Sequence, residues 1–280
     1  MVVPHTLRVT VLGLLLCAVT QVNAQHSEVR AALVNALHGT HASGRVLDWK
    51  TGEIIGTVGA DTSATPGSAV KPMLLEYALE HGVVQPSTTV YCRRSLHVAG
   101  RNLACTHPAT QPVIDAETAL AESCNTWFAE MARRMTGVQL DEALREAHLQ
   151  HQPMNAADAD ARVLAVLGLE GVSTTPEELA RSYREMLVRL PAAGVVKRGL
   201  KGSVEYGMAN EARVQGVTLL GKTGTASEHG QAWTHGWFAG GVPGKFVVVI
   251  YVPHGDGGTA ATLAAKFVRE AANSLRETAR

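Results

Sequence analysis

The fold is organised around one stretch, Thr65-Pro66-Gly67-Ser68-Ala69-Val70-Lys71-Pro72-Met73. Pro66 and Gly67 predict a loop that ends where a helix begins at Ser68, and an apolar run after it predicts that the helix is buried. Residues three apart share one face of a helix, so the amine of Lys71 is expected one turn from the hydroxyl of Ser68. A buried lysine can lose its charge and remove the proton of a serine hydroxyl, which makes the serine a nucleophile. Ser68 and Lys71 are therefore a candidate nucleophile and base.

Composition indicates a globular protein. The chain has 280 residues, 46% of them hydrophobic, which suits one large or two small domains with a real core. Lys and Arg together number 25, as do Asp and Glu, so no excess charge points to a nucleic-acid partner.

The first 24 residues are typical of a secretory signal peptide. Arg8 precedes an apolar run over residues 9–19, which ends in Val22-Asn23-Ala24 before Gln25. Eleven residues at about 1.5 Å each do not span about 30 Å of hydrocarbon, so a permanent anchor is the weaker interpretation. The mature chain is therefore expected to be periplasmic or secreted.

Three cysteines remain after the signal peptide, and their spacing leaves two alternatives open. Cys92 and Cys105 flank a predicted turn and could form a disulfide across a hairpin, with Cys124 as a small buried residue. A rival interpretation takes Cys92, His97, Cys105 and His107 as a zinc site, although this spacing fits no common zinc module. We predict the disulfide and assign no metal ligand and no cofactor.

The order of patterns along the chain predicts an α+β fold. A helix over residues 27–37 is followed by a hairpin over 45–49 and 53–58, then by helical patterns over 116–122, 126–135 and 140–147. Residues 163–169 fit a helix or a strand, and Thr175-Pro176-Glu177-Glu178 is a helix start. Strands over 217–221, 234–240 and 246–252 precede a helix over 259–276. We expect a single catalytic domain over residues 25–280. It would have a sheet lobe (25–67 and 201–280), in which helices flank an antiparallel sheet, and an all-helical lobe (about 68–200). The site would lie in the cleft between the two lobes.

Two further motifs accompany the serine and lysine. Ser123-Cys124-Asn125 falls at a break between two predicted helices, and Lys222-Thr223-Gly224-Thr225 follows a predicted strand. Alternation along a strand places Lys222 and Gly224 on one face and the two threonines on the other. Gly224 would leave room for a group to lie against that strand.

Together, S-x-x-K, S-x-N and K-T-G in this order resemble the penicillin-binding, serine transpeptidase and β-lactamase superfamily. Four further stretches are similar to the transpeptidase domain of class B penicillin-binding proteins: Pro66-Gly67-Ser68 with Pro72, residues 121–128, residues 175–180, and residues 235–240. The pair Cys92 and Cys105 is similar to cysteines of the elongation-type members. The resemblance covers roughly residues 45 to 270, and it implies the β-lactamase/transpeptidase-like fold.

The resemblance also implies a role for each motif residue. Ser68 would attack the carbonyl of a D-alanyl-D-alanine stem peptide of peptidoglycan or of a β-lactam, with Lys71 as the base. Ser123, placed by Asn125, would relay a proton to the leaving nitrogen, while Lys222 holds the charge of the network. The N–H groups of Ser68 and Thr225 would form the oxyanion hole, and a substrate strand would lie along residues 223–225, where the hydroxyls of Thr223 and Thr225 meet its carboxylate.

This resemblance implies a D,D-transpeptidase or carboxypeptidase that β-lactams inhibit covalently. The alternatives are a class D-like β-lactamase and a non-catalytic β-lactam-binding sensor module. Class B members usually carry an N-terminal pedestal and a membrane anchor, and the short distance from the signal peptide to the first strand predicts a bare catalytic domain. An unidentified cell-wall protein partner that supplies the pedestal is therefore also considered.

Overall fold

The computed structural model describes residues 24–109, 112–154, 158–228 and 230–277. The predicted signal peptide lies outside these residues except for Ala24. Within the described ranges, no helix combines the length and the apolar character that crossing a membrane requires.

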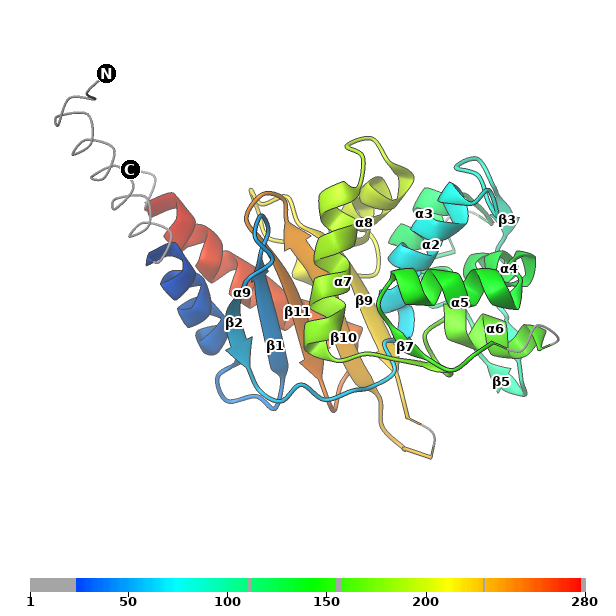
Figure 1. Ribbon diagram of the computed structural model, residues 1–280, viewed down its shortest axis with the longest axis horizontal. Coiled ribbons are helices and arrows are strands. Elements are labelled where there is room, and N and C mark those ends of the chain that lie inside the picture. The colour runs from blue at the N-terminus through cyan, green and yellow to red at the C-terminus, as the bar shows by residue number, and fades with distance from the viewer. Residues whose placement is uncertain (1–23, 110–111, 155–157, 229, 278–280) are drawn as a thin grey trace, which may run out of the picture.

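A five-stranded antiparallel sheet forms the frame of the molecule (Figure 1). Its strands run in the order β2-β1-β11-β10-β9, and all four neighbouring pairs are antiparallel. The bounds are β1 Ser43–Asp48, β2 Ile54–Val58, β9 Leu220–Ala226, β10 His235–Val242 and β11 Phe246–Val252. The ends of the chain thus share one sheet, as the sequence predicted, and β9 forms one edge of it.

Both faces of the sheet are buried under helices. Along β11, Val247 and Val249 pack in the same core as helix α7 (Pro176–Arg189), whereas Val248 and Ile250 pack in a second core with α9 (Gly257–Glu277). The helix over residues 24–37 joins this second core. Because both faces are covered, the central strand is apolar throughout instead of alternating with polar residues.

The chain between β2 and β9 is mainly helical; in Figure 1 its helix α7 lies in front of the sheet, and most of its other helices lie to the right of the sheet. Its helices besides α7 are α2 (Lys71–Glu80), α3 (Ala116–Ala121), α4 (Asn125–Arg134), α5 (Gly137–Glu146), α6 (Ala159–Val166) and α8 (Val195–Glu205). Short two-residue strands pair as β3 (Val90–Tyr91) with β6 (Val113–Ile114), β4 (His97–Val98) with β5 (Arg101–Asn102), and β7 (Gln150–His151) with β8 (Val172–Ser173). The predicted α+β fold with an antiparallel sheet and flanking helices is confirmed.

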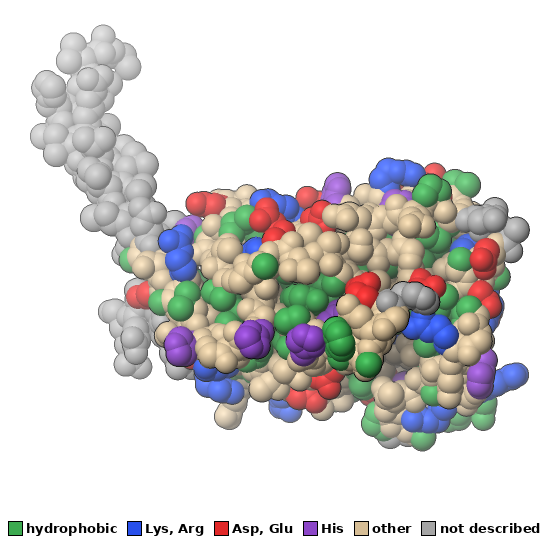
Figure 2. Space-filling view, turned by 90° about the horizontal axis from the view of Figure 1, so that it is seen from below, with side chains coloured by type: hydrophobic (Ala, Val, Ile, Leu, Met, Phe, Trp, Pro, Cys, Tyr) green, Lys and Arg blue, Asp and Glu red, His purple; other side chains and the backbone are tan. Residues whose placement is uncertain are grey.

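Charged side chains of both signs are interspersed on the face shown in Figure 2. This distribution agrees with the equal numbers of acidic and basic residues. The face offers no extended patch of one sign that would attract a polyanion.

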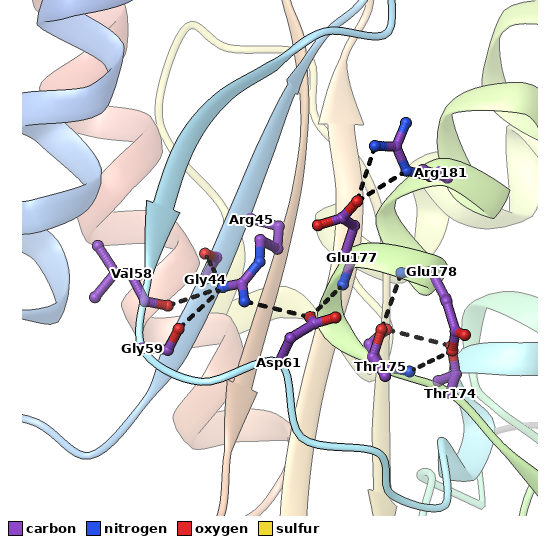
Figure 3. A network of polar contacts seen from close by, with 10 residues as sticks. All are labelled: Gly44, Arg45, Val58, Gly59, Asp61, Thr174, Thr175, Glu177, Glu178 and Arg181. Atoms are coloured by element: carbon purple, nitrogen blue, oxygen red, sulfur yellow. Dashed lines mark hydrogen bonds and ion pairs between the residues drawn. The ribbon is translucent and has the colours of Figure 1, made fainter.

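A polar network fixes the short connection from β2 to the Ser68 turn (Figure 3). The guanidinium of Arg45, on β1, donates to the carbonyls of Val58 and Gly59 at 3.0 and 3.4 Å and lies 3.3 Å from Oδ1 of Asp61. That oxygen also accepts the N–H of Glu177, in the first turn of α7, at 2.9 Å. One carboxylate therefore joins the sheet to the start of a helix, seven residues before Ser68.

Candidate active site

Ser68 lies in a 3-10 turn, η1 (Gly67–Val70), which leads directly into α2 at Lys71. The sequence predicted a helix that begins at Ser68, whereas the structure begins the turn at Gly67 and the α-helix three residues after the serine. The N–H of Lys71 donates to the carbonyl of Ser68. Ser68 is partly exposed, whereas Lys71 is fully buried.

The Ser68 turn is pressed against strand β9. A Cβ added to Gly67, whose φ is +54°, would lie 2.6 Å from the carbonyl oxygen and 2.7 Å from the nitrogen of Thr225. A Cβ added to Gly224 would lie 2.2 Å from the carbonyl oxygen of Pro66. Sequence reasoning expected Gly224 to leave room for a group against the strand, and the group that occupies this space is the Ser68 turn itself. The close approach brings the backbone beside Ser68 next to that of Thr225, the two residues proposed to supply the oxyanion hole.

Several side chains that sequence reasoning did not single out hold the turn in place. The hydroxyl of Tyr183, on α7, donates to the carbonyl of Ala69 at 2.7 Å. The carbonyl of Thr65 accepts from His235 Nε2 at 2.7 Å and from Trp237 Nε1 at 3.0 Å. These residues are buried among apolar neighbours, and an aromatic residue in an apolar run gives no sequence signal of such a role.

The second motif forms a strained turn between α3 and α4. Ser123 has φ +55°, a left-handed conformation that residues with a Cβ rarely adopt, and Asn125 is the first residue of α4. Such strain concentrates at functional sites, where the surrounding structure enforces it. The turn directs the side chains of both residues toward Lys71.

The amine of Lys71 joins the first motif to the second. Its Nζ lies 2.8 Å from Asn125 Oδ1, 3.1 Å from the carbonyl oxygen of Ser123 and 3.3 Å from Ser123 Oγ. Asn125 in turn donates through Nδ2 to the carbonyl of Leu103 at 3.1 Å. A neutral amine can donate to only two of these three oxygens, and it keeps one lone pair, so Lys71 can accept a proton while it remains anchored.

Burial controls the charge of this amine. Burial lowers the pKa of Lys71 to about 7, and the sulfur atoms of Cys124 and Cys105 oppose the shift. Burial and the charge of Lys71 hold the pKa of Lys222 well below its ordinary value. At pH 7 the Lys71 amine is therefore about half uncharged, and Lys222 favours the uncharged form, which is the state that a general base requires.

The sequence predicted that the third motif follows a strand. In the structure the motif lies inside strand β9. Lys222 is fully buried, and its Nζ donates to the carbonyl of Thr223 at 3.1 Å. The hydroxyl of Thr223 donates to the carbonyl of Met208 at 3.0 Å, and Thr225 Oγ1 accepts the N–H of Gly257 at 2.9 Å. Thr223 and Thr225 therefore lie on one face of β9, and Gly224 lies on the other face, against Pro66, as expected from the alternation of residues along a strand. Each threonine hydroxyl keeps capacity for a further hydrogen bond, and Thr225 is exposed.

The predicted disulfide is not present. Cys92, Cys105 and Cys124 are all free and buried, and the Sγ atoms of Cys92 and Cys105 lie 3.6 Å apart, against about 2.05 Å in a disulfide. The hairpin between them does form, through β4 and β5. His97, which the rival zinc interpretation included, is exposed on β4 and is not part of the cysteine cluster.

The fold and the three motifs agree with the comparison of the chain with known protein families. A model of the family described as "Penicillin binding protein transpeptidase domain" matches residues 43–189 and 161–273. The chain belongs to this family. No curated protein matches the sequence.

Solved structures with the same fold share little sequence with the chain. The D,D-transpeptidase domain of a peptidoglycan glycosyltransferase from Eggerthella lenta superposes with a TM-score of 0.76 at 18% identity, over 89% of this chain and 82% of that one. Pseudomonas aeruginosa PBP2, in complex with WCK 5153, gives 0.72 at 17% identity over 89% and 77%. The transpeptidase domain of Burkholderia pseudomallei penicillin-binding protein 3 gives 0.72 at 19% identity over 90% and 93%.

Proposed function

We propose that this protein is a penicillin-binding serine acyltransferase that acts on D-alanyl-D-alanine peptides of peptidoglycan through an acyl-Ser68 intermediate. The observation that carries the proposal is the buried Lys71 amine, hydrogen-bonded to Asn125 and Ser123 and one turn from the partly exposed Ser68. The family and the structural neighbours support the same class of substrate.

In the acylation step Ser68 Oγ bonds to the carbonyl carbon between the two D-alanines while Lys71 Nζ takes the hydroxyl proton. The negative charge that develops on the carbonyl oxygen meets the N–H groups of Ser68 and Thr225. The C–N bond then breaks as the leaving nitrogen receives a proton through Ser123 Oγ, which Lys71 replenishes. D-alanine leaves, and Ser68 carries the acyl ester.

The second step returns the free serine. An amine of another stem peptide, or water, attacks the ester carbon, and its proton returns to Ser68 through Lys71. Transfer to an amine is transpeptidation, and transfer to water is carboxypeptidation. A β-lactam enters the same sequence by ring opening, because its amide carbonyl replaces the D-alanyl carbonyl.

The edge position of β9 supports the mode of substrate binding. An edge strand has backbone N–H and C=O groups that an extended peptide can pair with. A peptide along residues 223–225 would place its terminal carboxylate near the hydroxyls of Thr223 and Thr225. We further propose that the protein is a class B, elongation-type member, that residues 25–280 are one catalytic domain, and that a cleaved signal peptide over residues 1–24 directs it to the periplasm or the outside.

The test is a peptide that ends in D-alanyl-D-alanine, incubated with and without a primary amine acceptor. We expect release of D-alanine, an acyl adduct on the protein and, with the acceptor, an amide product, all followed by mass spectrometry. Ser68→Ala should abolish all three, whereas Ser87→Ala, which removes an exposed serine hydroxyl, should leave them unchanged. Release of D-alanine by the Ser68→Ala variant would contradict the proposal.

A further inference from the structure

Thr65 lies three residues before Ser68, and each of its polar groups is bonded to the hairpin formed by β9 and β10. Oε1 of Glu228 accepts the N–H of Thr65 at 2.8 Å and its hydroxyl at 3.0 Å. The carbonyl of Thr65 accepts from His235 and Trp237. Glu228 follows the last residue of β9 by two positions, and His235 is the first residue of β10. The hairpin therefore holds Thr65 from both of its arms.

The same hairpin carries half of the proposed oxyanion hole. Thr225 pairs with Gly236 near the start of β10. It also lies against the Ser68 turn, since a Cβ added to Gly67 would be 2.7 Å from the nitrogen of Thr225. The N–H groups of Ser68 and Thr225, the two proposed donors, thus come from segments that are distant in the chain. Their relative position depends on how firmly the turn is fixed to the hairpin.

Other anchors of the turn come from a different part of the molecule. The N–H of Gly67 donates to the carbonyl of Gly168 at 2.9 Å, and Ala64 exchanges two backbone hydrogen bonds with Thr174 at 3.0 and 3.1 Å. Both partners lie on the segment between α6 and α7. These bonds fix the turn to the helical part of the chain, whereas the bonds of Thr65 fix it to the strand that supplies the other oxyanion-hole donor.

Glu228 is the charged member of this arrangement. Its side chain is 40% exposed, that of His235 is 2% exposed, and Oε1 of the carboxylate lies 3.9 Å from Nε2 of the imidazole. The same Nε2 lies 2.7 Å from the carbonyl oxygen of Thr65, so this nitrogen carries the proton and donates it to the carbonyl. The carboxylate takes the two donors of Thr65, and hydrogen bonds to an ionised acceptor are stronger than neutral ones.

We propose, building on the function proposed above, that Glu228 is a positioning residue for acylation. Its carboxylate fixes Thr65, and through Thr65 the N–H of Ser68, relative to the N–H of Thr225. Glu228 acts through Thr65 and not by contact with the substrate or by proton transfer. Without the carboxylate the two donors no longer converge on the carbonyl oxygen, and the charge that develops there is stabilised less well.

The test separates non-covalent binding from acylation. Stopped-flow labelling with a fluorescent penicillin at several concentrations gives the Kd of the first complex and the acylation rate constant. We expect Glu228→Ala to slow acylation about 10- to 100-fold with an unchanged Kd, since a misplacement of about 1 Å can cost about 100-fold. Glu228→Gln keeps an oxygen that can accept both hydrogen bonds and should react like wild type. Glu53→Ala, an exposed glutamate beside β2 at the opposite edge of the sheet, is the matched control.

Thr65 variants disturb the fold less and test the same contact from its other side. Thr65→Val removes the hydroxyl and keeps the N–H bond, so it should slow acylation less than Glu228→Ala. Added to Glu228→Ala, it should slow acylation no further, because the hydroxyl has already lost its acceptor. Thr65→Ser should react like wild type. Losses that multiply in the double variant, or a Glu228→Gln rate as low as that of Glu228→Ala, would overturn the role of the contact.

A peptide boronic acid reports on the oxyanion hole itself, because its tetrahedral adduct with Ser68 places an oxygen where the negative charge develops. In Glu228→Ala, at a temperature where circular dichroism shows it folded, the affinity for this probe should fall by the same factor as the acylation rate. Unchanged acylation and boronate affinity, or a change confined to the Kd for penicillin, would overturn the inference. A wild type that reacts with neither probe would instead contradict the proposed function, on which the role of Glu228 rests.

Discussion

The amine of Lys71 lies 2.8 Å from Oδ1 of Asn125, 54 residues further along the chain. This contact joins α2, the helix that follows the Ser68 turn, to the strained turn between α3 and α4. Because Asn125 is also bonded to the backbone at Leu103, the position of the base depends on three segments at once. The geometry of the base is therefore a property of the tertiary structure and not of the S-x-x-K motif alone.

The first prediction concerns this contact. Asn125→Ala should slow acylation by penicillin about 10- to 100-fold, because an unmade hydrogen bond in a buried site costs about 1 to 3 kcal/mol. Stopped-flow measurement with a fluorescent penicillin gives the rate. Asn102→Ala, an exposed asparagine on β5, is the matched control and should react like wild type. A wild-type rate in Asn125→Ala would show that the contact does not position the base.

The second prediction is the pH dependence of acylation. Burial lowers the pKa of Lys71 to about 7 against the opposing effect of the sulfurs of Cys124 and Cys105, and the charge of Lys71 helps to lower the pKa of Lys222 on β9. The uncharged base predominates above this pH, so the acylation rate should rise through pH about 7 and then level off. Lys201→Met, which removes an exposed lysine, should keep the same profile. A rate that falls as the pH rises through 7 would contradict Lys71 as the base.

The same pKa shift predicts the pH dependence of stability. The pKa of a lysine in an unfolded chain is about 10.4. Between pH 7 and about 10, Lys71 is therefore protonated in the unfolded chain and uncharged in the folded chain. The contribution of Lys71 to the free energy of unfolding should therefore rise with pH across this window and be constant below it. Urea denaturation of wild type and Lys71→Met at several pH values measures the difference. An equal pH dependence in both proteins would contradict the lowered pKa.

A further prediction separates close packing from backbone conformation. Gly67→Ala places a Cβ 2.6 Å from the carbonyl oxygen of Thr225 at a φ of +54°, whereas Gly82→Ala meets a φ of +67° with no atom within 4 Å. The left-handed conformation costs about 1 to 2 kcal/mol in both, and overpacking adds about 1 to 3 kcal/mol at Gly67. Chemical denaturation should therefore show the larger loss for Gly67→Ala. Equal losses would show that the turn does not pack tightly on β9.

Much of the fold can be predicted from the sequence because turns, apolar runs and helix caps are specified by residues that are close together in the chain. The hairpin of β1 and β2, strand β11 and helix α7 carry strong turn, apolar or capping patterns, and the Thr175 capping box with Pro176 forms as predicted. Helix α8 was not predicted, since Gly199 and Gly202 interrupt its pattern. Packing explains Gly199, where an added Cβ would lie 2.9 Å from Leu120; at Gly202 it would lie 2.7 Å from Oη of Tyr206, an exposed side chain that can move.

The sequence motifs name the residues of the candidate site but not the contacts that these residues make. The motifs named Ser68, Lys71, Ser123, Asn125 and Lys222, yet no spacing shows that Lys71 reaches Asn125 or that the Ser68 turn fills the space beside Gly224. The rival zinc interpretation named Cys92, Cys105 and His107 of the cysteine cluster but took the exposed His97 as the fourth member, whereas the fourth is Cys124, 17 residues beyond His107. Contacts between distant segments depend on the packed fold, and a single sequence does not encode them locally.

The lifetime and position of the penicilloyl adduct test the central claim most directly. Glu178 is used in the capping box of α7 and Glu177 is paired with Arg181 at 2.8 Å, and we predict that neither activates a hydrolytic water at Ser68. A missing general base slows deacylation by about 10² to 10⁴, and the adduct should therefore persist for minutes or longer.

The decisive measurement is intact mass spectrometry of the protein with penicillin over time, followed by peptide mapping. The account predicts a single stable adduct on Ser68, lost in Ser68→Ala and strongly slowed in Lys71→Ala, with negligible penicillin turnover. An adduct on another residue, or labelling that survives Ser68→Ala, would contradict Ser68 as the nucleophile. Steady-state hydrolysis well above about one per second would instead identify a β-lactamase.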